Sequence, residues 1–384
     1  MDAVAFRVRE RGPAAVRGGD TRLYDLVAAG LTAYARARFR LVVLGARFAL
    51  EPRTVVAATH RGDDDVPVAV AALYRGAHGL LRRNDGIHFA VRNDLFAPGF
   101  FAGYPPGVPR LLRRLLFHVD VGPVLRRRLP CHPVRNGARL RLVELLRELP
   151  DAPFDELLPP ELAEPLHERA RALGRDEPVL ARDVLHGDYA DLLWEIAGPD
   201  ELDSRRVEPI WRAHRRAASG EFRALCELVR GGGSLFICPE GRPSPDGRIG
   251  PLLGGIGSLV RRGRPERLVP VAFAYDPLVA GRTHAFVGVG EPVEPVADPD
   301  ELLALLRRVS PLTVASSLAA AHADGADPAS RLAADLDAAR AEGRPYDPEL
   351  DDVDVRAERL AVARRLAEGR NLLRLVNEYR SARA

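Results

Sequence analysis

The sequence predicts an α/β fold, a mostly parallel sheet flanked by helices. Short apolar runs rich in β-branched residues, such as RTVVAATH (53–60) and LVPVAFAY (268–275), have the composition of buried strands. Helical runs such as ARLRLVELLREL (138–149) and EFRALCELVRG (221–231) separate these strands. Strands that alternate with helices are typical of a parallel sheet covered by helices.

Each element of this fold has its own sequence pattern. Residues 20–50 predict one or two helices within an N-terminal helical segment, 1–52. Strands are expected in the α/β domain, 53–295, at 53–60, 87–92, 129–135, 234–240, 268–275 and 284–290. A buried helix is expected over 66–81. The acidic, Pro-rich start of 151–220 predicts a helical insertion between two strands, and 296–384 is predicted to be a helical C-terminal extension with a polar break at 342–355.

Composition excludes several classes of protein. The 384 residues carry 56 basic residues, all Arg, against 53 acidic ones, so the formal net charge of +3 gives no reason to expect a nucleic-acid partner. Cys131, Cys226 and Cys238 occur singly, without metal-ligand spacing, which indicates neither a metal site nor a disulfide framework. No secretory signal or apolar stretch of membrane-spanning length is apparent, so any membrane contact is expected to be peripheral.

The candidate catalytic element is a His followed five positions later by an Asp, at the end of the strand expected over 53–60. A neutral imidazole at His60 can accept a proton from an attacking hydroxyl, and a carboxylate at Asp65 can fix its tautomer and stabilise the imidazolium. The same spacing occurs twice more, at His186/Asp191 and His322/Asp327. A surface turn is the ordinary alternative for one such pair. Context favours His60, because it alone follows an apolar strand.

Further polar residues lie at the ends of other predicted strands. The strand over 234–240 leads into a segment that carries Glu240, Gly241, Arg242, Ser244 and Arg248. Arg135 ends the strand over 129–135. Because the carboxyl ends of parallel strands are where sites gather, His60, Arg135 and Glu240 are expected to serve one site.

This ordered set of blocks resembles the glycerolipid acyltransferase superfamily, which includes glycerol-3-phosphate and 1-acylglycerol-3-phosphate O-acyltransferases. The blocks are THRGDDD (59–65), HPVR (132–135), ICPEGRPS (237–244) and LVPVAF (268–273), in the order of the family. The resemblance covers roughly residues 50–295 without the insertion. It implies transfer of a fatty acyl group from acyl-CoA or acyl-carrier protein to a glycerol-phosphate acceptor in phospholipid synthesis. His60 would be the general base and Asp65 its partner, with no acyl-enzyme, cofactor or metal.

The resemblance also implies an acceptor site. Arg135 and Arg242 would bind the acceptor phosphate, since a guanidinium makes paired charge-assisted hydrogen bonds. Glu240 and Gly241 would shape that site, and Ser244 would be among the residues that bind the substrate. The Thr-Arg that follows Glu-Gly in the family is here Arg242-Pro243, so the Arg sits one position early and Arg248 is its substitute.

This departure leaves the acceptor open. Lysophosphatidate or another lipid or glycolipid alcohol is an alternative, and so is a non-catalytic, lipid-binding pseudoenzyme. A serine hydrolase is disfavoured, because the sequence has no nucleophile elbow.

A basic, amphipathic stretch predicts contact with a membrane surface. Residues 105–147 hold ten Arg against Asp120 and Glu144, and the aromatic-rich run 95–104 precedes them. Such a stretch can lie in the headgroup layer of an anionic membrane. The alternative is that these helices only cover the sheet and pair with the acidic segment after them. The expected location is the cytoplasm, peripheral on the cytoplasmic face of the membrane.

Overall fold

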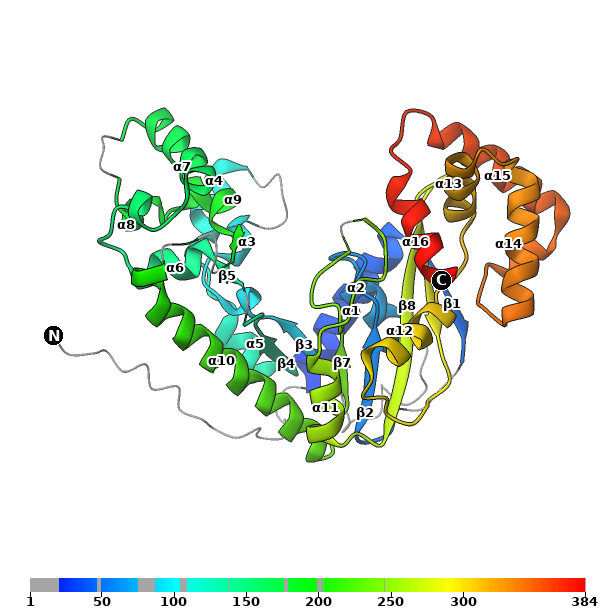
Figure 1. Ribbon diagram of the computed structural model, residues 1–384, viewed down its shortest axis with the longest axis horizontal. Coiled ribbons are helices and arrows are strands. Elements are labelled where there is room, and N and C mark those ends of the chain that lie inside the picture. Colours follow the sequence, from blue (N-terminus) through cyan, green and yellow to red (C-terminus); the bar gives the residue numbers. More distant parts are fainter. Residues whose placement is uncertain are drawn as a thin grey trace. The chain divides into compact units, whose positions relative to one another are not determined.

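The chain divides into two units, Met1–Phe89 together with Leu225–Ala384, and Ala90–Ala224. The structure, a computed structural model, describes residues 21–46, 50–74, 87–103, 109–137, 139–175, 179–198, 202, 204–244 and 246–383. Figure 1 shows the chain coloured from the N-terminus to the C-terminus. Among the described residues, no helix combines the length and the apolar character that crossing a bilayer requires.

A seven-stranded sheet has the order β1-β9-β8-β2-β7-β3-β4. Its strands are β1 (Arg40–Gly45), β2 (Thr54–Ala58), β3 (His88–Arg92), β4 (Cys131–Val134), β7 (Leu235–Ile237), β8 (Arg267–Asp276) and β9 (His284–Val289). The pairs β1–β9, β2–β7, β2–β8 and β3–β7 are parallel, whereas β8–β9 is antiparallel. The predicted α/β fold with a mostly parallel sheet is therefore confirmed.

The central strands are buried on both faces. Every residue of β2 (TVVAA) is buried, and β8 is buried from Leu268 to Ala274. Continuous apolar runs of this kind are typical of parallel strands covered on both sides, which explains why they were identifiable without an alternating pattern. The site residues considered below follow the ends of these strands.

The helical prediction for 20–50 is only partly correct. Helix α1 covers Thr21–Arg38, but Arg40–Gly45 form the strand β1. The run LVVL within β1 contains two β-branched valines, and the strand pairs in parallel with β9, in the register Arg40↔His284. The local pattern also fits a helix, but pairing with the edge of the buried strand β9 makes these residues a strand.

The other helices of the first unit cover this sheet or form the C-terminal extension. They are α2 (Asp65–Ala69), which continues as a π-helical turn at Val70–Tyr74, α11 (Gly255–Gly263), α12 (Pro299–Arg308), α13 (Val314–Asp324), α14 (Pro328–Glu342), α15 (Val353–Ala367) and α16 (Leu373–Arg383). The predicted buried helix is confirmed over 66–74, and 75–81 lie outside the described residues. The C-terminal helices of the predicted fold are confirmed as α12 to α16, and residue 384 lies outside the described residues. Its core gathers around α13, with Leu318, Leu336 and Leu360 buried together.

The second unit is mainly helical. It contains α3 (Phe100–Gly103), α4 (Arg110–Leu116), α5 (Gly122–Arg128), α6 (Leu142–Glu148), α7 (Pro160–Ala172), α8 (Ala181–Val184), α9 (Ala190–Leu193), most of α10 (Ser204–Arg230), and a small antiparallel sheet of β5 (Leu140–Arg141) and β6 (Ile196–Ala197). The helix predicted over 138–149 is thus helical only from Leu142, and the one predicted over 221–231 is the end of α10. Leu146, Phe154, Leu166, Tyr189 and Trp211 share one core, so the predicted insertion packs with the residues that precede it.

Candidate active site

The turn between β2 and α2 places His60 against Asp65. The Nδ1 atom of His60 lies 2.8 Å from Oδ2 of Asp65. The His60 side chain is 15% exposed and that of Asp65 is 1% exposed, so the ring is accessible while its partner is buried. A carboxylate can only accept, so Nδ1–H of the neutral imidazole donates to it. The lone pair of Nε2 is then available to take a proton.

Asp65 accepts hydrogen bonds from three further donors. Its Oδ2 accepts from the backbone N–H groups of Arg61 (2.6 Å) and Gly62 (2.9 Å). Its Oδ1 accepts from the hydroxyl of Tyr275, near the end of β8, at 2.8 Å. Tyr275 is not among the site residues predicted from the sequence. The block LVPVAFAY ends with it, but only the pairing of β8 with β2 brings it to Asp65.

The same turn is bound along β8. The N–H of Thr59 donates to the carbonyl of Val271 (3.0 Å), and Thr59 Oγ1 accepts from the N–H of Phe273 (2.9 Å). Arg61 is buried, and its guanidinium donates to the carbonyls of Phe273 and Gly247. Arg61 therefore belongs to the framework of the turn, a role that the sequence did not indicate.

Helix α1 contacts Asp64, the acidic residue that precedes Asp65 in the turn. The hydroxyl of Tyr34 donates to Asp64 Oδ1 at 2.7 Å, and Nε of Arg38 lies 3.4 Å from Oδ2 of Asp64. The hydrogen bond to Asp64 raises the pKa of Tyr34. Asp64 and Asp65 thus receive tyrosine hydroxyls from different elements, and only Asp65 also contacts the His60 ring.

Glu240 binds the backbone of His60. Its Oε1 accepts from the N–H of His60 at 2.7 Å, and its Oε2 accepts from the N–H of Gly250 at 2.9 Å. Glu240 is 6% exposed, and burial raises the pKa of its carboxyl group. Each oxygen has a further lone pair. The contacts observed, however, are those of a residue that fixes the position of the His60 backbone.

The described residues after Glu240, 241–244 and 246–250, belong to a loop that returns to His60. Gly241 has φ +70°, in the left-handed region of the backbone that favours glycine. The N–H of Ser244 donates to the carbonyl of His60 at 3.0 Å. The hydroxyl of Ser244 lies 3.3 Å from Oδ1 of Asp246. The loop is therefore bound to both backbone groups of His60, through Glu240 and Ser244.

The three predicted phosphate-binding arginines have different surroundings. Arg242 is exposed on the loop. Arg248 is also exposed, and its guanidinium lies 3.6 Å from Asp246. Arg135 belongs to the second unit, where Nη2 donates to Oε1 of Glu221 at 2.8 Å and to Asn93 at 3.1 Å. Arg135 is thus already paired with a carboxylate, and the structure places only Arg242 and Arg248 on the loop that contacts His60.

The other two pairs with the same spacing do not form the same contact. In the first pair, Asp191 binds Arg169 and Arg113, and the ring of His186 contacts Asp188 instead. In the second pair, His322 is exposed on α13, while Asp327 accepts from the N–H of Ser330 at the start of α14. Equal spacing therefore produces a His–Asp contact only at His60.

Among the described residues, no group of three or more His, Cys, Asp and Glu side chains is arranged to hold a metal ion. Comparison with family models and with curated proteins finds no match. A similar solved structure is the crystal structure of the 1-acyl-sn-glycerophosphate (LPA) acyltransferase PlsC from Thermotoga maritima. It has a TM-score of 0.36 and 11% sequence identity, over 73% of this chain and 75% of that one. Values this low identify neither a family nor an activity.

Proposed function

We propose that the chain is a glycerolipid O-acyltransferase of the cytoplasmic face of the membrane. It would move a fatty acyl group from acyl-CoA or acyl-carrier protein to a hydroxyl of a glycerol-phosphate acceptor, in phospholipid synthesis. The observation that carries the proposal is the accessible His60 ring bound through Nδ1 to the buried Asp65. The four blocks that resemble the glycerolipid acyltransferases, with this pair in the first of them, support it.

The reaction is a single displacement assisted by a general base. Nε2 of His60 takes the proton of the acceptor hydroxyl while the oxygen attacks the thioester carbonyl. Asp65 stabilises the imidazolium that forms. When the tetrahedral intermediate collapses, the carbon–sulfur bond breaks and the thiolate leaves with the proton from Nε2. The products are an ester and a free thiol, and His60 is neutral again.

The nearby thiol is unsuited to covalent catalysis. Cys238 follows β7, with its Sγ 3.9 Å from the carbonyl of Thr59. Burial raises the pKa of the Cys238 thiol well above its usual range, which suppresses the nucleophilic thiolate. Direct attack by the acceptor therefore agrees better with this site than an acyl-cysteine intermediate.

The loop 241–250 supports a phosphate-bearing acceptor. Glu240 and Ser244 bind it to the His60 backbone, and the exposed guanidinium groups of Arg242 and Arg248 lie on it. An Arg can bind a phosphate by paired hydrogen bonds while the base acts on a neighbouring hydroxyl. In this assignment Glu240 and Gly241 fix the shape of the loop.

A second candidate keeps the reaction and changes the acceptor to lysophosphatidate or another lipid alcohol. Among these acceptors, the pairing of Arg135 with Glu221 favours a lipid alcohol without a phosphate, because that guanidinium already has a carboxylate partner and the phosphate site loses one of its three predicted cations. A non-catalytic lipid-binding protein is less well supported, since lipid binding alone needs no oriented and accessible imidazole.

The deciding experiment is thiol release from palmitoyl-CoA, with and without glycerol-3-phosphate. We expect release that depends on the acceptor in the wild type and a loss of at least about a hundredfold in His60→Ala. His186→Ala is the matched control, because its pair has the same spacing but no ring contact with Asp191, and its rate should not change. Release without acceptor would indicate a hydrolase or another acceptor. No release from palmitoyl-CoA or palmitoyl-acyl-carrier protein would refute the proposal.

A further inference from the structure

Helix α4 of the second unit presents three of its four leucines to solvent, and the fourth, Leu116, packs against the core of the unit. Its sequence is RLLRRLL, and none of its residues is buried. Leu111 is 73% exposed, Leu115 65% and Leu112 44%. At about 100° per residue, these leucines occupy one half of the helix circumference, and the three arginines occupy the other. A helix on the surface of a globular unit ordinarily does the opposite and buries its apolar half.

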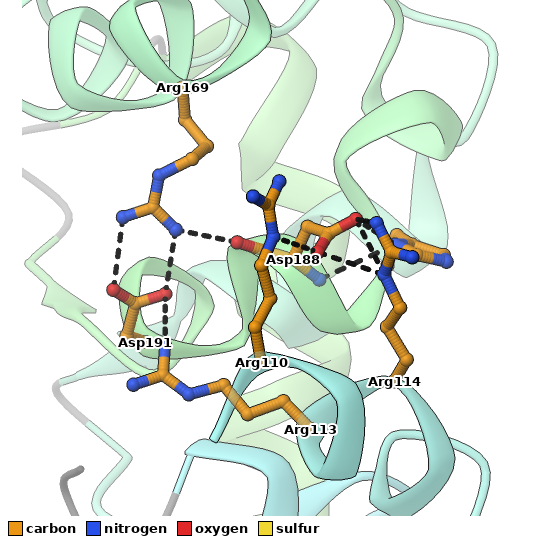
Figure 2. A network of polar contacts seen from close by, with 7 residues as sticks. Arg110, Arg113, Arg114, Arg169, Asp188 and Asp191 are labelled. Atoms are coloured by element: carbon orange, nitrogen blue, oxygen red, sulfur yellow. Dashed lines mark hydrogen bonds and ion pairs between the residues drawn. The ribbon is translucent and has the colours of Figure 1, made fainter. Parts of the chain in front are cut away.

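Ion pairs hold the charged half of this helix against the segment that carries Asp188 and Asp191. Nε of Arg110 lies 2.7 Å from Oδ1 of Asp188, Nη2 of Arg114 lies 2.8 Å from its Oδ2, and Arg113 binds Asp191 at 3.1 Å. Figure 2 shows these guanidinium groups directed at the two carboxylates. Asp188 is 5% exposed, and the hydrogen bond from Arg114 holds the pKa of its carboxyl group well below the usual range.

The backbone of α4 also lies directly on the segment that carries Asp188. A Cβ at Gly187 would be 2.6 Å from Cα of Arg114 and 2.8 Å from the carbonyl of Arg113. Charge pairing and this close approach fix the same orientation of the helix. The outward leucines are therefore a consequence of the packing of α4, and burying them against the unit would require breaking both contacts.

The surroundings of the exposed leucines are basic. The guanidinium-bearing side chains of Arg110 and Arg114 remain 58% and 48% exposed. Between Pro109 and Arg128 the chain has six Arg and one acidic residue, Asp120. Arg126, Arg127 and Arg128 are exposed in the last turn of α5. An apolar stripe in basic surroundings matches the boundary between headgroups and acyl chains in an anionic bilayer.

We propose that α4 docks on an anionic lipid bilayer, with Leu111, Leu112 and Leu115 entering the acyl boundary. A second copy of the chain is a poorer occupant. A helix of two turns, about 10 Å long, presents far less than the roughly 800 Å² per partner that a stable dimer buries. A symmetric dimer would also bring arginines against arginines. The inference rests on the proposed function only in its choice of a lipid as partner, since no step of the reaction is needed for vesicle binding.

The test is flotation with vesicles of dioleoylphosphatidylcholine and dioleoylphosphatidylglycerol in equal amounts. The variant is Leu111→Gln with Leu115→Gln, because Gln keeps the helix propensity of Leu. The matched control is Leu26→Gln with Val353→Gln, two side chains of the first unit that are 68% and 65% exposed. We expect the α4 variant to partition at least about tenfold less. The control should partition like the wild type.

Three outcomes would overturn the inference. They are absence of wild-type binding to the anionic vesicles, equal binding of the α4 variant and the control, and dimerisation in light scattering that the α4 variant abolishes without any vesicle binding. Failure of the proposed function is a separate result. If the wild type binds vesicles through α4 but releases no thiol, the docking surface is supported and the proposed reaction is refuted. If the protein turns over soluble acyl-CoA but does not bind vesicles, the reaction is supported and the docking surface is refuted.

Discussion

Replacing Tyr275 by Phe removes one hydroxyl from the His60–Asp65 pair and little else. The hydroxyl donates to Oδ1 of Asp65 at 2.8 Å, and the ring packs beside Phe39 with centroids 5.5 Å apart. Phenylalanine keeps this ring contact. The substitution therefore tests whether the hydrogen bond to Oδ1 of Asp65 affects the function of His60, which binds Oδ2 of the same carboxylate.

The magnitude follows from the contacts of Asp65. A hydrogen bond to a charged group contributes about 1.5–3 kcal/mol, which corresponds to about tenfold to a hundredfold in rate. Three donors remain on Oδ2 after the substitution, those of His60, Arg61 and Gly62. We therefore expect the lower end of this range, a fall of about tenfold in kcat. KM for the thioester should stay unchanged, because Tyr275 acts through Asp65 and is a positioning residue.

The assay is thiol release with glycerol-3-phosphate, and Tyr34→Phe is the control. Tyr34 also donates its hydroxyl to a carboxylate, Asp64, at 2.7 Å, but that carboxylate has no contact with the His60 ring among those described. Tyr34→Phe should leave kcat unchanged. In a His60→Ala background, Tyr275→Phe should have no further effect, because the residue through which it acts is absent.

The reasoning about Tyr275 is refuted by any of three results. The first is a wild-type kcat in Tyr275→Phe. The second is an equal loss in Tyr34→Phe, which would indicate a general effect on the turn. The third is an undiminished effect in the His60→Ala background, which would show that Tyr275 acts independently of the base.

Three further predictions test the surroundings of the site. Glu240→Gln places an amide NH₂ opposite one of two backbone N–H groups, so one hydrogen bond is lost. The free energy of unfolding in urea should therefore fall by about 1–3 kcal/mol, and kcat should fall at least about tenfold. Burial raises the pKa of Asp276 to about 6. The protonated carboxyl group therefore stabilises the folded state fully below the pKa of the unfolded state, and this stabilisation is lost as the pH rises through 6. We expect the free energy of unfolding, measured in urea, to fall by about 3 kcal/mol over this range, and we expect no such fall in Asp276→Asn. Arg374 of α16 donates to the carbonyl of Arg61, so Arg374→Ala should lower kcat about fivefold, whereas Arg380→Ala on the same helix, which pairs with Asp324, should not.

The sheet was predictable where a strand is buried on both faces. The runs in β2 and β8 are apolar throughout, because helices cover both sides of a parallel sheet. The strand β1 was missed, because six residues with LVVL fit a helix and a strand equally well. What decides between them is the edge of β9, which lies more than two hundred residues later in the sequence. No local pattern contains that information.

The site divides in the same way. The His60–Asp65 contact lies within one turn, so spacing and the preceding strand are enough to predict the pair. Tyr275 reaches Asp65 only because β8 is the neighbour of β2 in the sheet. Arg135 ends its strand as expected, yet its guanidinium binds Glu221, which the sequence does not place beside it. Local geometry is thus available from spacing, whereas a partner from another strand or helix requires the topology.

Two buried carboxylates act on His60 through different atoms, and this explains why spacing alone fails elsewhere. Asp65 binds the ring and sets which nitrogen is available, whereas Glu240, 180 residues away, binds the backbone N–H and sets where the ring stands. At His186 the spaced carboxylate is taken by arginines, and at His322 the carboxylate caps the next helix. Here the imidazole of the His-x4-Asp pattern is oriented where a second segment of the sheet binds the backbone of the histidine, so Asp65 and Glu240 variants should differ. Loss of the Asp65 carboxylate should affect proton transfer, and loss of the Glu240 carboxylate should affect both the rate and the stability of the turn.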